Sequence, residues 1–500
     1  MLAERAIAGK RTWMRRMVPV LLMLALALIP ACRQQAAGTI SVTVIGDAPK
    51  IADPARGRLT MPDAILLQNV AQGLVSFDAS GNIVGGLAER WNVSDDGLSY
   101  IFRIASTNWP DGKKVTAEQV AKILKRQIGA RSKNELKDTL GAVEDIVPMT
   151  DRVIEIRLLA PRPNLLALLA QPDLAIIQHG GGTGPFTATV ADKATDQLRL
   201  TRKILASDDA EATKEEVLLS GAPVAQAVEA FADGKTDLVL GGTFTDLPFA
   251  RRLKLPRDSL QFDPASGLFG LIPLRSDNHL DNPEVRRLLS QAIDRDQVIS
   301  ALGIPGLLPR ATLLDAGLDQ LPAPVAPAWL GTPLADRITG LRAEADRIYG
   351  STKPTLSIAL PQGPGADVLL AILSRSWGAL GFIVQRAPDG ASVDFALIDE
   401  VAPSSSAAWF VRRFRCDAAA ICDPDADKLI EAARQTPVPQ QRYALLQQAA
   451  SRIDDAQLFL PITAPVRWSL VGRRIQGFAG NRFAIHTLTN LQQRPATGSQ

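Results

Sequence analysis

The chain of 500 residues lacks a large excess of charge of either sign, with a formal net charge of +3. It contains 55 lysine and arginine residues and 52 aspartate and glutamate residues. Five of the basic residues and one of the acidic residues lie within residues 1–31, so the remainder carries 50 basic against 51 acidic residues. A near-neutral chain without a basic stripe offers little for the phosphate backbone of a nucleic acid to contact. We therefore expect no nucleic-acid partner.

Sequence signatures of common catalytic sites are also missing. The chain has no HExxH, GxSxG or CxxC motif, and Gly234–Thr236, its nearest approach to a phosphate-binding loop, lacks the first glycine of that motif. Its histidines, His179, His279 and His486, are far apart in the sequence. We therefore expect a binding protein without catalytic residues, a cofactor or a metal ion.

Only one long apolar run is present, and it lies near the N-terminus. Arg16 is the last basic residue before this run, and a nearly unbroken apolar stretch covers residues 18–29. This order is typical of a bacterial secretory signal. About a dozen residues span only ~18 Å as a helix, well short of the ~30 Å hydrocarbon core of a bilayer. The sequence therefore predicts a signal peptide at residues 1–31 rather than a membrane span.

The end of this run resembles the processing site of bacterial lipoproteins. Ile29-Pro30-Ala31-Cys32 is similar to a lipobox, in which Cys32 would become the lipidated first residue of the mature chain. Ordinary cleavage after an alanine is the alternative. We expect an exported, periplasmic protein whose contact with the membrane is a lipid anchor on Cys32.

Cysteine is scarce in the rest of the chain. Only Cys416 and Cys422 follow Cys32, and an oxidising compartment permits them to pair. A metal site would need more ligands than two thiols, and no histidine lies near them in the sequence. We expect a local disulfide that closes a small loop.

Strand and helix patterns alternate along the chain. Apolar residues alternate with polar ones in three segments, which predicts strands over 39–45, 98–104 and 153–159. A capping box at Thr116–Gln119 predicts the start of a helix. Further helices are expected from Asn282, with Pro283 as the first residue, and over about 366–380 and 440–453. The pattern favours an α/β protein.

A series of motifs then follows the chain nearly from end to end. They are Gln72–Asp78, Gly81–Trp91, Ser94–Phe102, Trp109–Lys113, Thr116–Val120, Gly182–Phe186, Asn282–Arg295 and Trp377–Phe382. In residue type, order and spacing they resemble the family 5 extracellular solute-binding proteins, the oligopeptide, dipeptide and nickel receptors of ABC importers.

This resemblance implies a periplasmic binding protein-like type II fold, in which two lobes joined by a hinge enclose a cleft and the first lobe carries an additional domain. The expected first lobe covers 38–60, 178–268 and 472–490, and the inserted domain covers 61–177. The expected second lobe covers 269–471, and 491–500 form a flexible tail. The implied protein is a monomer that captures a small solute, a peptide among the candidates, and docks on permease and ATPase subunits.

The resemblance also indicates where a ligand would bind. In peptide-binding members, a segment of the second lobe supplies an aspartate that pairs with the α-amino group of the peptide. The matching segment is Phe395–Ser406, and Val401 stands near the position of that aspartate. Unless Asp399 or Glu400 replaces it, a buried ammonium group would lack a partner. This departure counts against an ordinary peptide ligand.

We expect Asp399, Glu400 and Val401 to line the cleft, with Trp409 as a stacking wall or, alternatively, a core residue. Arg56 and Arg58 are candidates to face an anionic ligand or simply solvent.

Phe186 is a candidate for the cleft or for the core. Two other functions stay open at this stage: an exported hydrolase with dispersed catalytic residues, and an envelope scaffold whose pocket is filled by its own side chains.

Overall fold

The computed structural model describes residues 38–204, 213–275, 279–388 and 390–493. From Ile40 onward, the described residues belong to one compact unit. The predicted signal peptide and Cys32 lie outside the described residues, as do 494–500 of the predicted tail. No helix within the described ranges is both long and apolar enough to span a bilayer.

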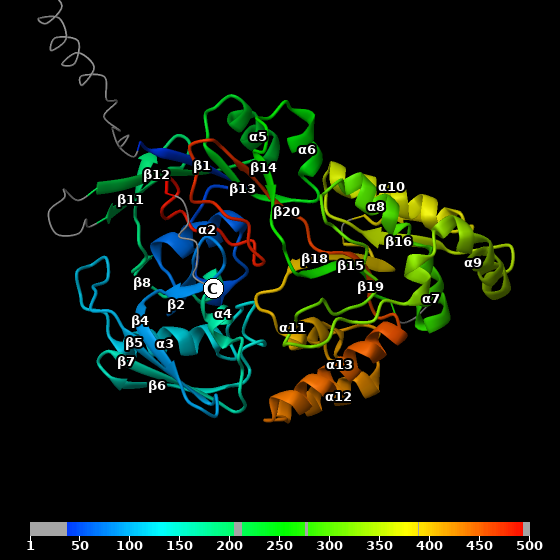
Figure 1. Ribbon diagram of the computed structural model, residues 1–500, viewed down its shortest axis with the longest axis horizontal. Helices are drawn as coiled ribbons and strands as arrows, with labels where there is room; N and C mark the ends of the chain where they lie inside the picture. The colour runs from blue at the N-terminus through cyan, green and yellow to red at the C-terminus, as the bar shows by residue number, and fades with distance from the viewer. Residues whose placement is uncertain (1–37, 205–212, 276–278, 389, 494–500) are drawn as a thin grey trace, which may run out of the picture. The chain divides into compact units, whose positions relative to one another are not determined.

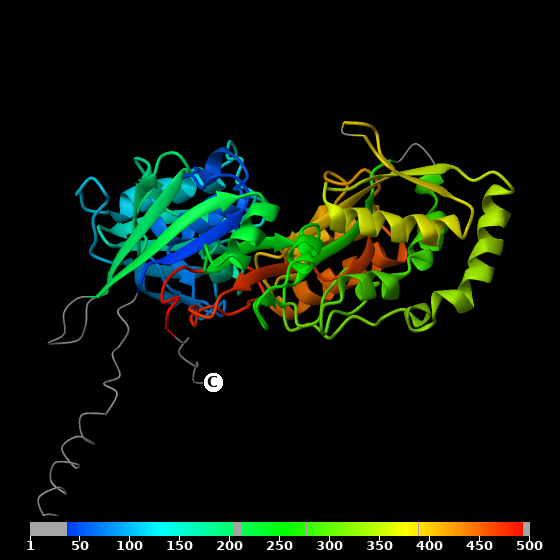
Figure 2. The ribbon, with the colours of Figure 1, turned by 90° about the horizontal axis from the view of Figure 1, so that it is seen from above.

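A mixed sheet of seven strands includes the first described strand. Its order is β10 (Thr187–Asp192), β11 (Gln197–Ile204), β12 (Thr213–Ala222), β1 (Ile40–Ile45), β13 (Leu238–Thr243), β20 (Arg467–Val471) and β14 (Leu260–Phe262). Strand β1 is parallel to β12 and β13, and the other pairs are antiparallel. Figure 2 shows the long β11–β12 ribbon beside β1. Helices α2 (Met61–Val70), α5 (Val224–Ala232) and α6 (Leu247–Arg252) accompany this sheet.

A second sheet is antiparallel and has four strands. Its order is β4 (Ala88–Val93), β5 (Ser99–Ile104), β7 (Val153–Leu158) and β6 (Val143–Thr150). Two short hairpins, β2 (Val75–Phe77) with β3 (Ile83–Gly85) and β8 (Ile177–Gln178) with β9 (Gly181–Gly182), lie nearby in sequence. Helix α3 (Ala117–Ile128) packs on β6 and β7, and the short α4 (Leu165–Leu169) follows β7.

A third sheet has five strands and carries most of the helices. Its order is β17 (Ile383–Arg386), β16 (Thr355–Ala359), β18 (Phe395–Val401), β15 (Gly267–Pro273) and β19 (Leu460–Thr463). The helices in this part of the sequence are α7 (Pro283–Ala292), α8 (Arg295–Leu302), α9 (Leu334–Tyr349), α10 (Pro364–Gly378), α11 (Ala407–Val411), α12 (Pro424–Gln435) and α13 (Pro439–Asp455). Helices α12 and α13 pack side by side (Figure 1).

The predicted α/β class is confirmed, and so are the individual elements predicted above, within a few residues at their ends. The helix starts are specified locally. Thr116 Oγ1 accepts from the Gln119 backbone amide while the Gln119 side chain accepts from the Thr116 amide, which completes the capping box. Asn282 caps α7, and Pro283 occupies its first position.

Two elements pack across the expected domain boundaries. Strand β20 falls within residues assigned to the second lobe and pairs with β13 and β14 of the seven-stranded sheet. Its Trp468 fits there because a Cβ atom on Gly242 would lie 2.2 Å from the indole ring, so only glycine leaves room. Helix α2, assigned to the inserted domain, buries its apolar side chains in the same core cluster as β1. The domain boundaries themselves stay a prediction.

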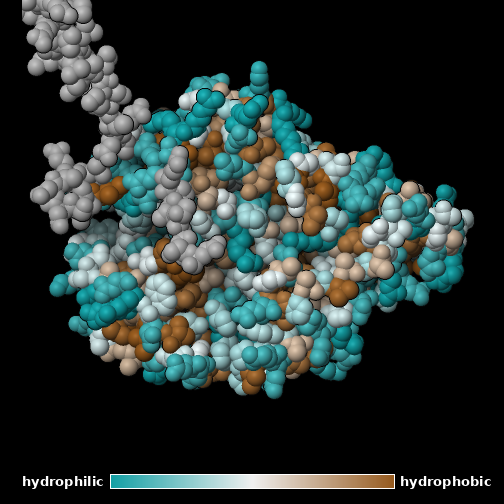
Figure 3. All heavy atoms as spheres, viewed as in Figure 1, coloured by the Kyte–Doolittle hydropathy of each residue, from teal (hydrophilic) through white to brown (hydrophobic). Residues whose placement is uncertain are grey.

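The described hydrophobic residues gather into four buried clusters. On the face shown in Figure 3, hydrophobic side chains are scattered in small groups among hydrophilic ones. Scattered apolar residues of this kind are normal for a protein surface.

Candidate functional site

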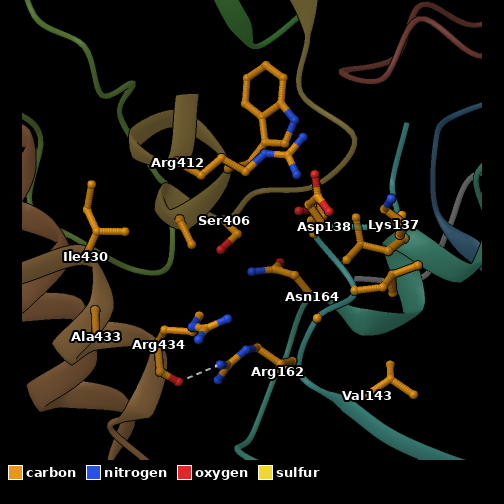
Figure 4. Close-up of a pocket in the computed structure, with 18 of the residues that line it drawn as sticks. Lys137, Asp138, Val143, Arg162, Asn164, Ser406, Arg412, Ile430, Ala433 and Arg434 are labelled. Carbon is orange, nitrogen blue, oxygen red and sulfur yellow. Dashed lines mark hydrogen bonds between the residues drawn. The ribbon is translucent and has the colours of Figure 1, made fainter. Parts of the chain in front are cut away.

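A cavity of about 780 Å³ lies between two segments of the chain that are far apart in the sequence (Figure 4). Residues between 128 and 168, next to the four-stranded sheet, form one wall, which we call the α3–α4 wall. Residues between 404 and 446, which follow β18, form the other, the α11–α13 wall. A volume of this size is typical of sites for small organic molecules.

The α11–α13 wall is set by a carboxylate at the start of α11. Asp319 Oδ2 accepts hydrogen bonds from the Ala407 amide at 2.7 Å and from Ser406 Oγ at 3.3 Å. Ser406 is the N-cap residue, but its side chain makes no capping bond, so Asp319 satisfies the free amide of the first turn in its place. This contact fixes α11 and with it Trp409.

The α3–α4 wall is shaped by prolines on both sides of Arg162. Pro161 and Pro163 fix their own backbone φ angles and favour an extended chain between them. Nη1 of Arg162 donates to the Pro161 carbonyl at 2.9 Å. Figure 4 shows the Arg162 side chain reaching across toward α12.

Three hydrogen bonds connect the two sides of the cavity. One joins lining residues of the two walls, and two involve residues just outside the lining. Nη2 of Arg162 donates to the Arg434 carbonyl at 3.2 Å, and Nδ2 of Asn164 donates to Asp319 Oδ1 at 2.8 Å (Figure 4). Nε2 of Gln171 donates to the Pro403 carbonyl at 2.7 Å. The parts of the chain on the two sides of the cavity therefore contact each other directly.

Basic side chains outnumber acidic ones around the cavity. Seven basic residues line it: Lys137, Arg162, Arg412, Arg413, Arg415, Arg434 and Arg442. Two acidic residues, Asp138 and Asp417, do so as well. The lining is therefore cationic.

Part of this positive charge is neutralised by ion pairs. Arg413 pairs with Glu400, Arg415 pairs with Asp417 at 3.1 Å, and Arg434 pairs with Glu431 at 3.0 Å. Arg162, Arg412 and Arg442 make no ion pair with any residue of the described ranges.

The environment of these three arginines disfavours their charge. Burial, together with the nearby Arg442, lowers the pKa of Arg162 to about 10. Burial and the neighbouring Arg413 lower the pKa of Arg412. Burial also lowers the pKa of Arg442, although the carboxylate of Asp319 acts in the opposite direction. Because arginine starts from a very high pKa, all three remain charged at neutral pH.

Of the residues predicted to line the cleft, Trp409 does line the cavity. It is 6% exposed and packs edge-on against Phe410, with ring centroids 5.0 Å apart. Trp409 therefore serves as a wall of the cavity and as part of the core at the same time.

Asp399, Glu400 and Val401 are not among the lining residues. Asp399 Oδ1 accepts from Nη1 of Arg467 at 2.8 Å, and Glu400 pairs with Arg413. Burial raises the pKa of Asp399, although Arg467 acts against this shift. The structure thus gives both carboxylates partners within the chain, and a direct ligand contact from them stays a prediction.

Arg56, Arg58 and Phe186 also lie away from the cavity lining. Arg56 and Arg58 are exposed, and each is 3.6 Å from a carboxylate, that of Asp53 and Glu135 respectively. Phe186 is 3% exposed and belongs to the core cluster of β1.

Arg162, Arg412 and Arg442 are the residues that sequence reasoning missed. The pair Arg412-Arg413 stands three residues after Trp409, which is a signal that the sequence did offer. Arg162 lies about 250 residues earlier in the chain, and no spacing rule connects it with Arg412.

The disulfide closes a loop at the edge of the cavity. Cys416 and Cys422 are bonded in the structure, and Asp417 and Ala418 inside their loop line the cavity. Within the described ranges, no three His, Cys, Asp or Glu side chains are grouped so that they could hold a metal ion.

Comparison with known proteins identifies the family. Residues 82–332 match the model of the bacterial extracellular solute-binding proteins, family 5 Middle. The probable di/tripeptide-binding protein 5 of Pseudomonas aeruginosa (strain UCBPP-PA14) is 24% identical over 473 residues, which cover 82% of this chain and 87% of that protein.

Solved structures with the same fold include Haemophilus influenzae OppA in complex with RPPGFSPFR, which has a TM-score of 0.74 and 16% identity and covers 90% of this chain and 98% of that chain. AgaA in complex with agropinic acid, from A. tumefacien R10, has a TM-score of 0.70 and 17% identity and covers 90% and 96%. The family model matches half of the sequence, and the chain therefore belongs to the bacterial extracellular solute-binding proteins of family 5.

Proposed function

We propose that this chain is the substrate receptor of an ABC importer, which captures a small solute in the cavity between the two walls and delivers it unchanged to a membrane permease. The observation that carries this proposal is the cavity itself, which is lined by residues from two distant parts of the sequence. A scaffold without a ligand would fill this space with its own side chains. Hydrolysis of ATP belongs to a separate subunit of the importer.

The two-walled construction supports binding by closure. A solute that contacts both walls stabilises their association only by the difference between its free energies of binding to the closed and open forms. The hydrogen bonds of Asn164 and Gln171 show that such an association is sterically possible.

The names of similar proteins leave a range of solutes open. The relative from P. aeruginosa is named for di- and tripeptides, and the two similar structures hold a nonapeptide and agropinic acid. A peptide-like solute is therefore one candidate. The chemistry of the cavity lining is the remaining evidence for the class of solute.

In this proposal, residues 1–31 direct export. A lipid on Cys32 then anchors the mature protein in the periplasm to a membrane. The intact mass of the mature protein tests this proposal. The expected mass corresponds to a chain that starts at a diacylated Cys32, and the Cys32→Ser variant should lack the lipid. An unmodified chain that starts elsewhere would contradict it.

Native mass spectrometry of protein purified from its own periplasm tests the receptor function. We expect one bound small molecule per chain, released with unchanged mass after prolonged incubation. Chemical conversion of the molecule would overturn the proposal.

Two matched variants connect this result to the cavity. Ala408 lines it, and Ala371 is exposed on α10 outside it. Ala408→Phe should abolish retention of the solute, whereas Ala371→Phe should not.

A further inference from the structure

Arg442 is the most deeply buried cation of the cavity. It projects from the first turns of α13, is 5% exposed and lines the cavity. Its guanidinium donates no hydrogen bond to any residue in the part of the chain that the structure describes. A buried charge is normally paired or hydrogen-bonded, because leaving it unpaired costs free energy. The Tyr443 ring, whose centre is 5.7 Å from the guanidinium carbon, and the nearby Asp319 carboxylate stabilise this charge, but neither accepts a hydrogen bond from it. Among the described residues, its donors are therefore left for a ligand.

Arg412 and Arg162 are in a related situation. The Arg412 side chain forms neither a hydrogen bond nor an ion pair within the described ranges. Arg162 donates to the carbonyls of Pro161 and Arg434 but contacts no carboxylate of the described residues. Figure 4 shows that Arg162 and Arg412 enter the cavity from opposite walls. All three side chains line the same cavity.

The acidic groups nearby do not balance this charge. Asp319 already accepts hydrogen bonds from Ala407, Ser406 and Asn164. Asp138 faces Arg412 across the cavity (Figure 4). Lys137, whose ammonium group donates to the carbonyls of Ala130 and Ser132, adds a further positive charge. The lining cations without an ion pair within the described ranges are Lys137, Arg162, Arg412 and Arg442. These four positive charges exceed the two negative charges of Asp138 and Asp319.

The chemistry of the arginine side chain indicates what it would bind. Arginine presents a planar set of donors that fits carboxylate or phosphate groups. Ser404 lines the same cavity, but its unpartnered Oγ is fully buried and is not open to a ligand there. The arginines are therefore the groups of the cavity that are consistent with an anionic acceptor.

We infer that the cavity selects a solute with at least two negative charges, held by Arg442 and Arg412 on the α11–α13 wall and by Arg162 on the α3–α4 wall. This inference rests on the proposed receptor function and names its substrate class. A ligand with one anionic group would leave cations on one wall unpaired. A ligand that carries a free ammonium group would meet charge of its own sign, and the carboxylates of Asp399 and Glu400 are occupied by Arg467 and Arg413.

Isothermal titration calorimetry with defined probes tests this substrate class. Ala-Glu-Glu and Ala-Gln-Gln are matched in size and differ in side-chain charge, and Ala-Lys-Lys carries the opposite charge. Citrate and fructose 1,6-bisphosphate present carboxylates and phosphates without a peptide. We expect at least one of the three polyanions to bind about 10-fold or more tightly than Ala-Gln-Gln, and Ala-Lys-Lys to bind most weakly. The preferred polyanion distinguishes a peptide, carboxylate or phosphate source.

Variants assign the effect to the named residues. Arg442→Gln and Arg412→Gln should each weaken binding of the preferred polyanion about 10- to 100-fold, as expected for loss of a charge-assisted contact. Arg375→Gln, at an exposed arginine of α10 outside the cavity lining, is the matched control and should change the affinity less than about 2-fold. If Arg442→Gln does not fold, the half-buried Arg412 still provides the test.

The outcomes separate this inference from the receptor function. Binding of all three polyanions no tighter than that of Ala-Gln-Gln, or a preference for Ala-Lys-Lys over every polyanion, would overturn the anion selectivity and leave the receptor function intact. Failure of every polyanion to bind would also overturn it, and the receptor function would then depend on the solute found by native mass spectrometry. Polyanion binding that the arginine variants do not weaken would overturn the assignment to this cavity.

Discussion

Two groups of charged side chains lie close together in the sequence but differ in how the structure treats them. On β18, Asp399 pairs with Arg467 and Glu400 pairs with Arg413. A few residues later, Arg412 lines the cavity without an ion pair in the described ranges, as does Arg442 on α13. The difference teaches that the availability of a charge for a ligand depends on the rest of the fold. Position in a familiar segment is not enough.

The two groups of charges also differ in what their burial costs in free energy. The Asp399–Arg467 pair is mostly buried, with side chains 15% and 12% exposed, and each charge compensates the other. The cavity arginines are desolvated as well, but within the described ranges none of the three forms an ion pair with a carboxylate. Removing a charge should therefore have opposite effects on stability at the two places.

The largest change in stability is expected when the Asp399–Arg467 ion pair is broken. Arg467→Met leaves Asp399 buried without its cation and should lower the free energy of unfolding by about 3 kcal/mol. Urea denaturation of this variant and of the exposed control Arg375→Met measures the effect. The double variant Asp399→Leu with Arg467→Met should recover most of the loss, because it removes both buried charges. A single variant as stable as the control would show that the pair does not stabilise the fold.

The next effect concerns the loop that borders the arginines. Replacing Cys416 and Cys422 with alanine opens a short loop and should cost about 2 kcal/mol, mainly because the unfolded chain gains freedom. Denaturation with and without a reductant measures this loss, and a reductant should not affect the variant. Unchanged stability of the wild type under reduction would contradict the prediction.

A smaller effect of opposite sign is expected in the cavity. Arg442→Met keeps the apolar stem but removes a buried charge that Arg162 repels, so the ligand-free protein should gain up to about 1 kcal/mol of stability. Ligand-free protein, prepared by partial unfolding and dialysis, should be compared with wild type by urea denaturation. A clear loss of stability would mean that Asp319 compensates this arginine and would weaken the contrast with β18.

A separate effect, which depends on pH, comes from the buried carboxyl group of Asp454. Burial raises the pKa of Asp454 to about 8 from its ordinary 3.8, while the amide of Leu313 donates to it at 2.8 Å. Between these two pH values the folded protein binds more protons than the unfolded chain, so this group's contribution to stability falls as the pH rises from about 4 to about 8.

Asp454→Asn keeps an oxygen for the Leu313 amide and removes the titration. Melting temperatures at pH 5 and pH 8.5 should differ less in the variant than in the wild type, by a few degrees at most. An identical pH dependence would show that Asp454 is charged in the folded protein.

Local sequence signals predicted the elements of the fold well, because capping and alternation act over a few residues. Thr116 with Gln119 and Asn282 with Pro283 specify helix starts without help from distant parts of the chain. Trp409, which follows the segment that resembles the ligand-binding region of the family, lines the cavity, and its contact with a ligand stays a prediction.

The charged part of the site could not be predicted in the same way. Whether Asp399 is free depends on Arg467, which another strand brings to it from 68 residues away. Phe186 fits a core and a cleft equally well as a sequence feature, and only the packing around β1 decides between them.

The three hydrogen bonds between the walls have a kinetic consequence. The contacts of Asn164, Gln171 and Arg162 with the opposite wall involve groups of the chain alone, so they form whether or not a solute is present. Any opening of the two walls must break these three hydrogen bonds. A solute whose entry requires that opening is captured at a rate that levels off at high solute concentration.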